Sequence, residues 1–291
     1  MKGKATYGVV LGALIAGTSG VIIKSIDSID ATSIAWFRTA VPTAIVFAWM
    51  LLNGVKPFRG NYRKMMVGAL INSLRIYLYL IAFIYTSIGN AVILFYTWPI
   101  MVALLGFLFL GEKVAKYQSF LLVLTFLGIV LAYSDKPFSF ESRDFLGMLA
   151  ALGASFANAA TVVLFKSEVE NYHSLEMIFY QNVLGVFIFL PFFIMGAGNA
   201  EIVDIGLGTL FGFIAGILVF GLFFHGLTYL KAATASTLMY LEVVSAVLFG
   251  YLFFNEVLSV HMVLGGLLIM ASNLLLIRFD RKKNVPEIKH K

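Results

Sequence analysis

Ten long apolar runs constrain the fold of this chain more than any other feature. A helix needs about 20 apolar residues to cross roughly 30 Å of hydrocarbon, and it satisfies its own backbone hydrogen bonds there. The runs cover approximately Thr6–Ile23, Ala31–Leu52, Met65–Tyr85, Ala91–Leu110, Tyr117–Tyr133, Phe145–Phe165, Leu175–Met195, Leu207–Tyr229, Ala232–Phe254 and Val260–Ile277. We therefore predict an all-α polytopic membrane protein with ten transmembrane helices.

Composition separates this chain from soluble proteins and from nucleic-acid-binding proteins. It is 60% hydrophobic and 12% charged, whereas about a quarter of the residues of a soluble domain are charged. The net charge of +6 comes from short basic clusters between the apolar runs, not from the continuous basic patch that binds nucleic acid. Cysteine is absent, which excludes disulfides and thiolate metal sites. We expect the lipid bilayer and a small molecule as partners, and no cofactor.

The basic residues of the connections are distributed unequally between the two sides of the predicted bundle. One side holds 16 Lys and Arg residues and the other holds 3. The larger group comprises Lys2, Lys4, Lys56, Arg59, Arg63, Lys64, Lys113, Lys116, Lys166, Lys231, Arg278, Arg281, Lys282, Lys283, Lys289 and Lys291, and the smaller group Lys24, Lys136 and Arg143. Because cytoplasmic connections carry an excess of basic residues, both termini and connection 53–64 are predicted to be cytoplasmic, with connection 134–144 on the opposite side.

A displacement of 144 positions reveals an internal repeat. It aligns Ala91–Glu112 with Ala235–Glu256, and 8 of these 22 positions are identical. We predict two five-helix repeats, residues 1–137 and 138–291. Five is an odd number, so the second repeat enters the membrane with inverted orientation.

The ends of the fourth and ninth runs carry a family resemblance. The first contains Tyr96-Thr97-Trp98-Pro99 and closes with Phe109-Leu110-Gly111-Glu112, and the second closes with Phe253-Phe254-Asn255-Glu256. In these segments the chain resembles the drug/metabolite transporter superfamily, in its EamA-like branch of ten-helix permeases. Val243 and Glu242 depart from the pattern, because they stand at the counterparts of Pro99 and Trp98.

This resemblance implies a central cavity between the two repeats. Spans 1 to 4 and 6 to 9 would line the cavity, and spans 5 and 10 would be peripheral. It also implies transport of amino acids, related metabolites or drugs, often as export. We expect the protein in the cytoplasmic (inner) membrane of a bacterium, as a monomer or weak homodimer.

Three charged residues lie well inside predicted spans, where a charge costs about 2.5–3.5 kcal/mol on insertion scales. They are Arg38, Arg75 and Glu242. A guanidinium matches the two oxygens of a carboxylate, so Arg75 or Arg38 is a candidate clamp for an anionic group of the substrate. Glu242 would meet a substrate ammonium or carry a proton. The alternative is a buried Arg–Glu pair that only holds the halves together.

Aromatic and amide side chains complete the predicted binding site. Tyr96 and Tyr240 are repeat-related and would face each other across the pseudo-axis, where their rings would wall the cavity. Trp98 and Tyr79 are further candidates for substrate contact. Asn72 precedes Arg75 by three positions and would extend a polar stripe on one helical face. Ordinary packing is the alternative for the aromatic residues, and an interhelical hydrogen bond is the alternative for Asn72.

The sequence favours a secondary transporter that works by alternating access. The first-choice substrate is a small zwitterionic or amphipathic metabolite, an amino acid or a related compound, and protons are the candidate coupling ion. A nucleotide-sugar or phosphate-ester exchanger is the alternative within transport, although only Arg75 and Arg38 could hold the phosphate. An intramembrane enzyme would need paired carboxylates, a Ser/His pair or a His-rich metal motif. None of these appears in the sequence, and we predict that the protein is not an enzyme.

Overall fold

The computed structural model describes the chain apart from residues 1, 136–141, 197, 199, 256 and 284–291. Within the described residues there are fifteen helical segments and no strand. The first half contains α1 (Lys2–Ala16), α2 (Thr18–Lys24), α3 (Ala31–Leu52), α4 (Tyr62–Tyr85), α5 (Ile88–Phe95), α6 (Trp98–Leu110) and α7 (Lys116–Ala132). The second half contains α8 (Ser142–Lys166), α9 (Ser174–Gly196), α10 (Ile202–Phe213), the π-helix η1 (Ile214–Val219), α11 (Phe220–Tyr229), α12 (Ala232–Leu238), α13 (Leu241–Phe254) and α14 (Val260–Lys283).

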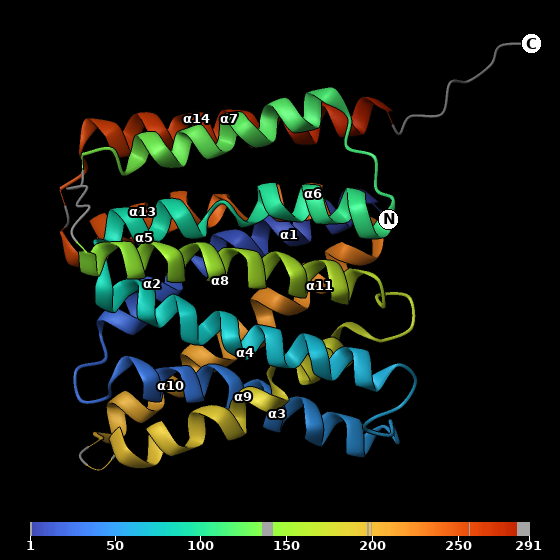
Figure 1. Ribbon diagram of the computed structural model, residues 1–291, viewed down its shortest axis with the longest axis vertical. Coiled ribbons are helices and arrows are strands. Elements are labelled where there is room, and N and C mark those ends of the chain that lie inside the picture. Colours follow the sequence, from blue (N-terminus) through green and yellow to red (C-terminus); the bar gives the residue numbers. More distant parts are fainter. Residues whose placement is uncertain (1, 136–141, 197, 199, 256, 284–291) are drawn as a thin grey trace, which may run out of the picture.

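These segments form ten passes that run side by side (Figure 1). Pass 1 is α1 with α2, pass 4 is α5 with α6, pass 8 is α10 through α11, and pass 9 is α12 with α13; each other pass is one helix. Nine passes are long and apolar enough to cross a membrane, and the remaining apolar helix, α7, has 17 residues. That length is at the lower end of the spanning range. The predicted all-α fold of ten membrane helices is confirmed.

Successive passes run in opposite directions, so their connections lie alternately at the two faces of the bundle. The basic face carries the start of α1, connections 53–61, 111–115, 167–173 and 230–231, and the described end of α14. The opposite face carries connections 25–30, 86–87 and 257–259. Because α1 begins at the basic face and α8 begins at the opposite face, the two halves have inverted orientations. The predicted boundary between the repeats, 137/138, lies outside the described residues.

The main contacts between passes recur between the repeat-related passes of the other half. The packing of α4 on α8 is matched by that of α1 on α11, and the packing of α8 on α5 and α6 is matched by that of α1 on α13. The contact of α4 with α9 has its counterpart in α3 with α10. Helices α3 and α9, and likewise α7 and α14, pair with their own counterparts. This pattern is that of a pseudo-two-fold axis lying in the membrane plane.

Helix breaks and caps also repeat. Pass 4 is interrupted after Phe95 and pass 9 after Leu238, both close to the pseudo-axis. Gly111 and Asn255, 144 positions apart, end the two passes in the left-handed conformation, with φ of 65° and 51°. Glycine and asparagine are residue types that tolerate this conformation at a helix end. Glu256, the repeat counterpart of Glu112, lies outside the described residues.

Candidate functional site

A cavity of about 430 Å³ lies between the two halves. Side chains from α1, α2, α3, α4, α5, α6, α8, α10, η1, α11, α12–α13 and the end of α7 line it. Passes 1 to 4, 6, 8 and 9 thus contribute as the family resemblance implies, but no described residue of pass 7 does. Helix α9 stands behind α3 instead, where it supports one of the cavity side chains. One close approach shapes the wall, because a Cβ on Gly17 would lie only 2.1 Å from Oγ of Ser245.

The cavity opens toward the opposite face of the bundle. Its lining includes Ile23 and Ala31, which flank connection 25–30, and Tyr133 at the end of α7. The lining continues past the middle of the bundle to Val162 and Phe223. None of the lining residues belongs to a connection of the basic face. The structure is therefore an open-to-one-side conformation.

Two buried contacts join residues that are related by the repeat. Tyr240 donates a hydrogen bond of 2.8 Å from its hydroxyl to the backbone oxygen of Tyr96, and Arg38 donates one of 3.3 Å from Nη1 to Oδ1 of Asn182. Each pair is separated by 144 positions. Symmetry-related residues can touch only where they straddle the axis, so these two contacts locate the pseudo-two-fold axis beside the cavity.

Arg38 and Arg75 both line the cavity, and both are held by neutral amides. Besides its bond to Asn182, Arg38 lies over the ring of Phe220 at 4.9 Å. Arg75 donates from Nε to Oδ1 of Asn72 at 3.0 Å, and Asn72 donates to the backbone oxygen of Gln181 at 2.8 Å. Asn72 is absent from the lining, so its place is behind Arg75. The terminal nitrogens of Arg75 have no hydrogen-bond partner among the described residues.

Glu242, on α13, lines the same cavity. Neither arginine forms an ion pair with it within the part of the chain that the structure describes. The two guanidinium groups are nevertheless close enough to interact with its charge. The alternative reading of these residues, a closed Arg–Glu pair that joins the halves, is not the arrangement seen here.

Tyr79, Tyr96 and Trp98 all line the cavity. Tyr79 packs on Phe95 with 4.5 Å between ring centroids, and Tyr96 lies 6.1 Å from Tyr240. Tyr240 is placed differently from the expectation that it walls the cavity. It is fully buried and absent from the lining, so it supports Tyr96 from beneath.

Several lining residues were not singled out in the sequence. The aromatic ones are Phe95, Tyr133, Phe211, Phe220 and Phe223. A phenylalanine inside an apolar run carries no sign of whether it faces lipid or a cavity. The repeat could have found two of them, because Phe223 is the counterpart of Tyr79 and Phe220 that of Ile76, and all four line the cavity. Tyr133 departs from the expectation that pass 5 is peripheral, because it lines the cavity from the end of that pass.

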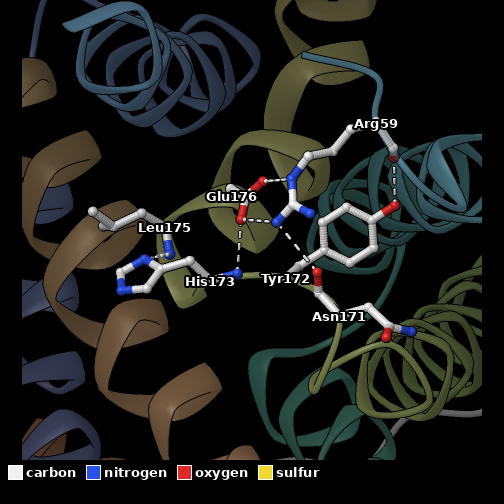
Figure 2. A network of polar contacts seen from close by, with 6 residues as sticks. All are labelled: Arg59, Asn171, Tyr172, His173, Leu175 and Glu176. Carbon is white, nitrogen blue, oxygen red and sulfur yellow. Dashed lines mark hydrogen bonds and ion pairs between the residues drawn. The ribbon is translucent and has the colours of Figure 1, made fainter. Parts of the chain in front are cut away.

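An ion-pair network joins two connections at the basic face (Figure 2). Arg59, from connection 53–61, donates from Nε and Nη2 to the two carboxylate oxygens of Glu176, each at 2.7 Å. These bonds raise the pKa of the Arg59 guanidinium above its ordinary value. The Tyr172 hydroxyl donates to the backbone oxygen of Arg59 at 2.7 Å. Nearby, Lys64 and Glu168 pair at 2.9 Å. The network joins the two halves at the basic face.

No group of three potential metal ligands is present among the residues that the structure describes. The site is therefore a cavity with two cations, one carboxylate and aromatic walls. Such a site can bind a small charged molecule through its ionic groups and its apolar body.

Comparisons with known proteins agree with this arrangement. The EamA-like transporter family matches residues 4–134 and 145–278, so the chain belongs to this family. It is an integral membrane transporter of small molecules and not an enzyme.

Individual relatives are also named as transporters. A pseudopaline exporter of Pseudomonas aeruginosa is 27% identical over 282 residues, covering 93% of this chain and 96% of the relative. An uncharacterized transporter of Archaeoglobus fulgidus is 27% identical over 271 residues, covering 92% and 94%. Solute carrier family 35 member G1 of Mus musculus is 23% identical, in a match that covers 93% of this chain and 77% of the relative. A crystal structure with 15% identity has the same fold, with a TM-score of 0.82 over 98% of this chain and all of that chain.

Proposed function

We propose that this protein is a secondary transporter that exports a small zwitterionic or amphipathic metabolite, an amino acid or a related compound. The observation that carries the proposal is the cavity beside the pseudo-axis, lined by Arg38, Arg75 and Glu242 and closed at one face only. A mid-membrane site between two inverted halves is where alternating-access carriers bind their cargo. The relative named as a pseudopaline exporter supports the direction.

The two arginines are the proposed anion clamp. A guanidinium fork binds a carboxylate through two parallel hydrogen bonds, and terminal donors of Arg75 are free to do so among the described residues. Glu242 is the proposed partner of a substrate ammonium. Tyr79, Tyr96 and Trp98 offer apolar walls for the body of the cargo.

The basic face is proposed to be cytoplasmic, in the inner membrane of a bacterium. The unequal distribution of Lys and Arg supports this orientation, in which both termini are cytoplasmic and the cavity is open to the outside. The chain contains no cysteine, so a single cysteine can be labelled without background. A cysteine at Arg59 should resist an impermeant maleimide added outside intact cells, and its labelling there would reverse the proposed orientation.

Glu242 is also the proposed proton carrier. If it binds either a proton or a substrate ammonium, the proton gradient and the cargo are coupled through one site. The proposed unit of function is a monomer or a weak homodimer.

Transport assays in proteoliposomes test this function. Uptake of a panel of radiolabelled amino acids would be measured with and without a pH gradient. We expect gradient-driven accumulation in the wild type, and exchange without accumulation in Glu242→Gln. An E242Q protein that folds normally and keeps the wild-type pH dependence would contradict the coupling role, while failure to transport any member of the panel would contradict the substrate class.

A further inference from the structure

The charges that line the cavity do not balance. Among the described lining residues, two are arginines and Glu242 is the one carboxylate. The other polar lining residues, which include Ser19 and Asn158, are uncharged. With all three groups ionised, the empty cavity carries one excess positive charge.

Among the residues that the structure describes, no carboxylate behind the cavity removes this excess. Arg38 is held by the amide of Asn182, which itself donates to the backbone oxygen of Ile178 at 2.8 Å. Arg75 is held by the amide of Asn72. Described ion pairs join Arg59 to Glu176 and Lys64 to Glu168, both at the basic face and away from the cavity. Both guanidinium groups are therefore positioned without being neutralised.

The repeat indicates that this imbalance is specific to the site. The counterparts of Arg38, Arg75 and Glu242 are Asn182, Val219 and Trp98, so each charge stands opposite a neutral residue. Val219 and Trp98 also line the cavity. At each of these three pairs of positions, one half therefore folds with a neutral side chain. The fold itself does not require the charges of Arg38, Arg75 and Glu242, so they need a different explanation.

We infer that the cargo is an amino dicarboxylate: a compound with two carboxylates, one ammonium and an apolar body. This inference deepens the proposed function and rests on it. Each carboxylate would meet one guanidinium and the ammonium would meet Glu242, which gives the loaded cavity no net charge. A simple zwitterionic amino acid would leave one arginine unpaired when the transporter closes around its cargo, and an unpaired charge in a closed site is destabilising. The aromatic walls would take the apolar body.

Four small probes test the inference by calorimetric titration of the purified protein. They are N-carboxymethyl-L-phenylalanine, with two carboxylates and an ammonium, L-phenylalanine, N-acetyl-L-phenylalanine, which lacks the ammonium, and phenyl phosphate. We expect the dicarboxylate to bind at least about tenfold more tightly than each of the others, as one additional charged hydrogen-bonded contact allows.

Variants assign that preference to named residues. Arg38→Gln and Arg75→Gln should each bind the dicarboxylate and L-phenylalanine with affinities within about threefold of each other. Arg75→Lys keeps the charge and should retain part of the preference, which guards against a folding defect in R75Q. Glu242→Gln should remove the advantage over N-acetyl-L-phenylalanine. Arg63→Gln, an exposed position on the same helix as Arg75, is the matched control and should leave all affinities unchanged.

The outcomes separate this inference from the proposed function. Equal binding of L-phenylalanine and the dicarboxylate by the wild type would overturn the amino dicarboxylate and leave an amino-acid transporter standing. Tightest binding of phenyl phosphate would overturn it in favour of a phosphate-ester exchanger. If none of the four probes binds, the inference and the proposed substrate class are both wrong.

Discussion

At each face of the bundle, a junction joins the two halves; the two junctions are related by the repeat but are held by different interactions. At the basic face, connection 53–61 meets connection 167–173. At the opposite face, the repeat-related partners are connection 25–30 and the start of α10. The first junction is built from ion pairs, namely Arg59–Glu176 and Lys64–Glu168. The second relies on Asp204, which accepts hydrogen bonds from the backbone nitrogen of Ser28 at 2.7 Å and from its hydroxyl at 2.5 Å.

This difference between the junctions accompanies the difference between a closed basic face and an open opposite face. Beside the Arg59–Glu176 pair, Tyr180 packs against Tyr172 with 5.4 Å between ring centroids. Phe165, Tyr180, Phe224 and Tyr240 are all almost completely buried. The Asp204 junction, by contrast, stands beside the mouth of the cavity and is intact while the cavity is open. We therefore expect the ion pairs to break in the transport cycle and the Asp204 bonds to act as fixed structural support. An inward-open state requires that the basic face separate.

The largest effect is expected from Glu176→Gln. The side chain of Glu176 is 3% exposed and accepts two bonds from Arg59, whereas glutamine has one acceptor oxygen and loses at least one of these charge-assisted hydrogen bonds. Bonds of this kind are worth about 1.5–3 kcal/mol each, and losing even one would shift the balance of conformations about tenfold or more. Labelling of a cysteine at Asn158, which lines the cavity, should become faster from the basic face in inverted vesicles. An unchanged labelling rate would show that the ion pair does not hold this face closed.

A smaller effect is expected from Tyr240→Phe at the floor of the cavity. The variant removes the hydrogen bond to the backbone oxygen of Tyr96 and is expected to destabilise the closed floor by about 0.5–1.5 kcal/mol. Basic-face labelling of the same cysteine should rise by about twofold to tenfold. Tyr117→Phe is the matched control, since it removes a hydroxyl that bonds Asp280 in the α7–α14 pair. Equal effects of the two variants would point to general destabilisation.

Asp204→Asn tests the opposite junction. We expect the midpoint of thermal unfolding to fall by a few degrees, because the amide is a weaker acceptor for the Ser28 donors. The side from which the cavity is labelled should not change. A shift of accessibility as large as that of Glu176→Gln would remove the proposed distinction between the junctions.

The smallest effect concerns pH. Burial alone would raise the pKa of Glu168, but hydrogen bonds from Lys64, Asn171 and Asn61 outweigh it, and the pKa lies below its ordinary value of 4.5. A carboxyl group with a lowered pKa stabilises the folded arrangement above its ordinary value and loses that contribution as the pH falls through the lowered one. Basic-face accessibility should therefore stay constant down to about pH 4.5 and rise below it. Glu168→Gln should abolish that rise.

The sequence carried enough information for the fold and for the location of the symmetry axis. Hydrocarbon thickness determines the length of an apolar run, so the passes could be read directly. The 144-residue offset paired Tyr96 with Tyr240, and the structure places these two side chains in contact. The charges at Arg38, Arg75 and Glu242 were visible because a charge is costly in a span.

Other parts of the site left no readable pattern. Arg59 and Glu176 are separated by 117 positions and lie near polar connections, where no periodicity indicates a partner. The sequence could not show that Tyr240 lies behind Tyr96 and not in the cavity wall. The repeat predicts that both rings lie near the axis but not which of them faces the cavity. The absence of pass 7 from the lining depends on how α9 packs against α3.

The most direct test of the central claim is a reversible cross-link across the basic face. Cysteines at Arg59 and Glu176, in a chain without other cysteines, would be joined by a short bis-methanethiosulfonate reagent in proteoliposomes. If this junction must separate during each cycle, the cross-linked protein should stop transporting, and a reductant that removes the cross-link should restore transport. Transport that continues at the uncross-linked rate would contradict the claim that the basic face opens.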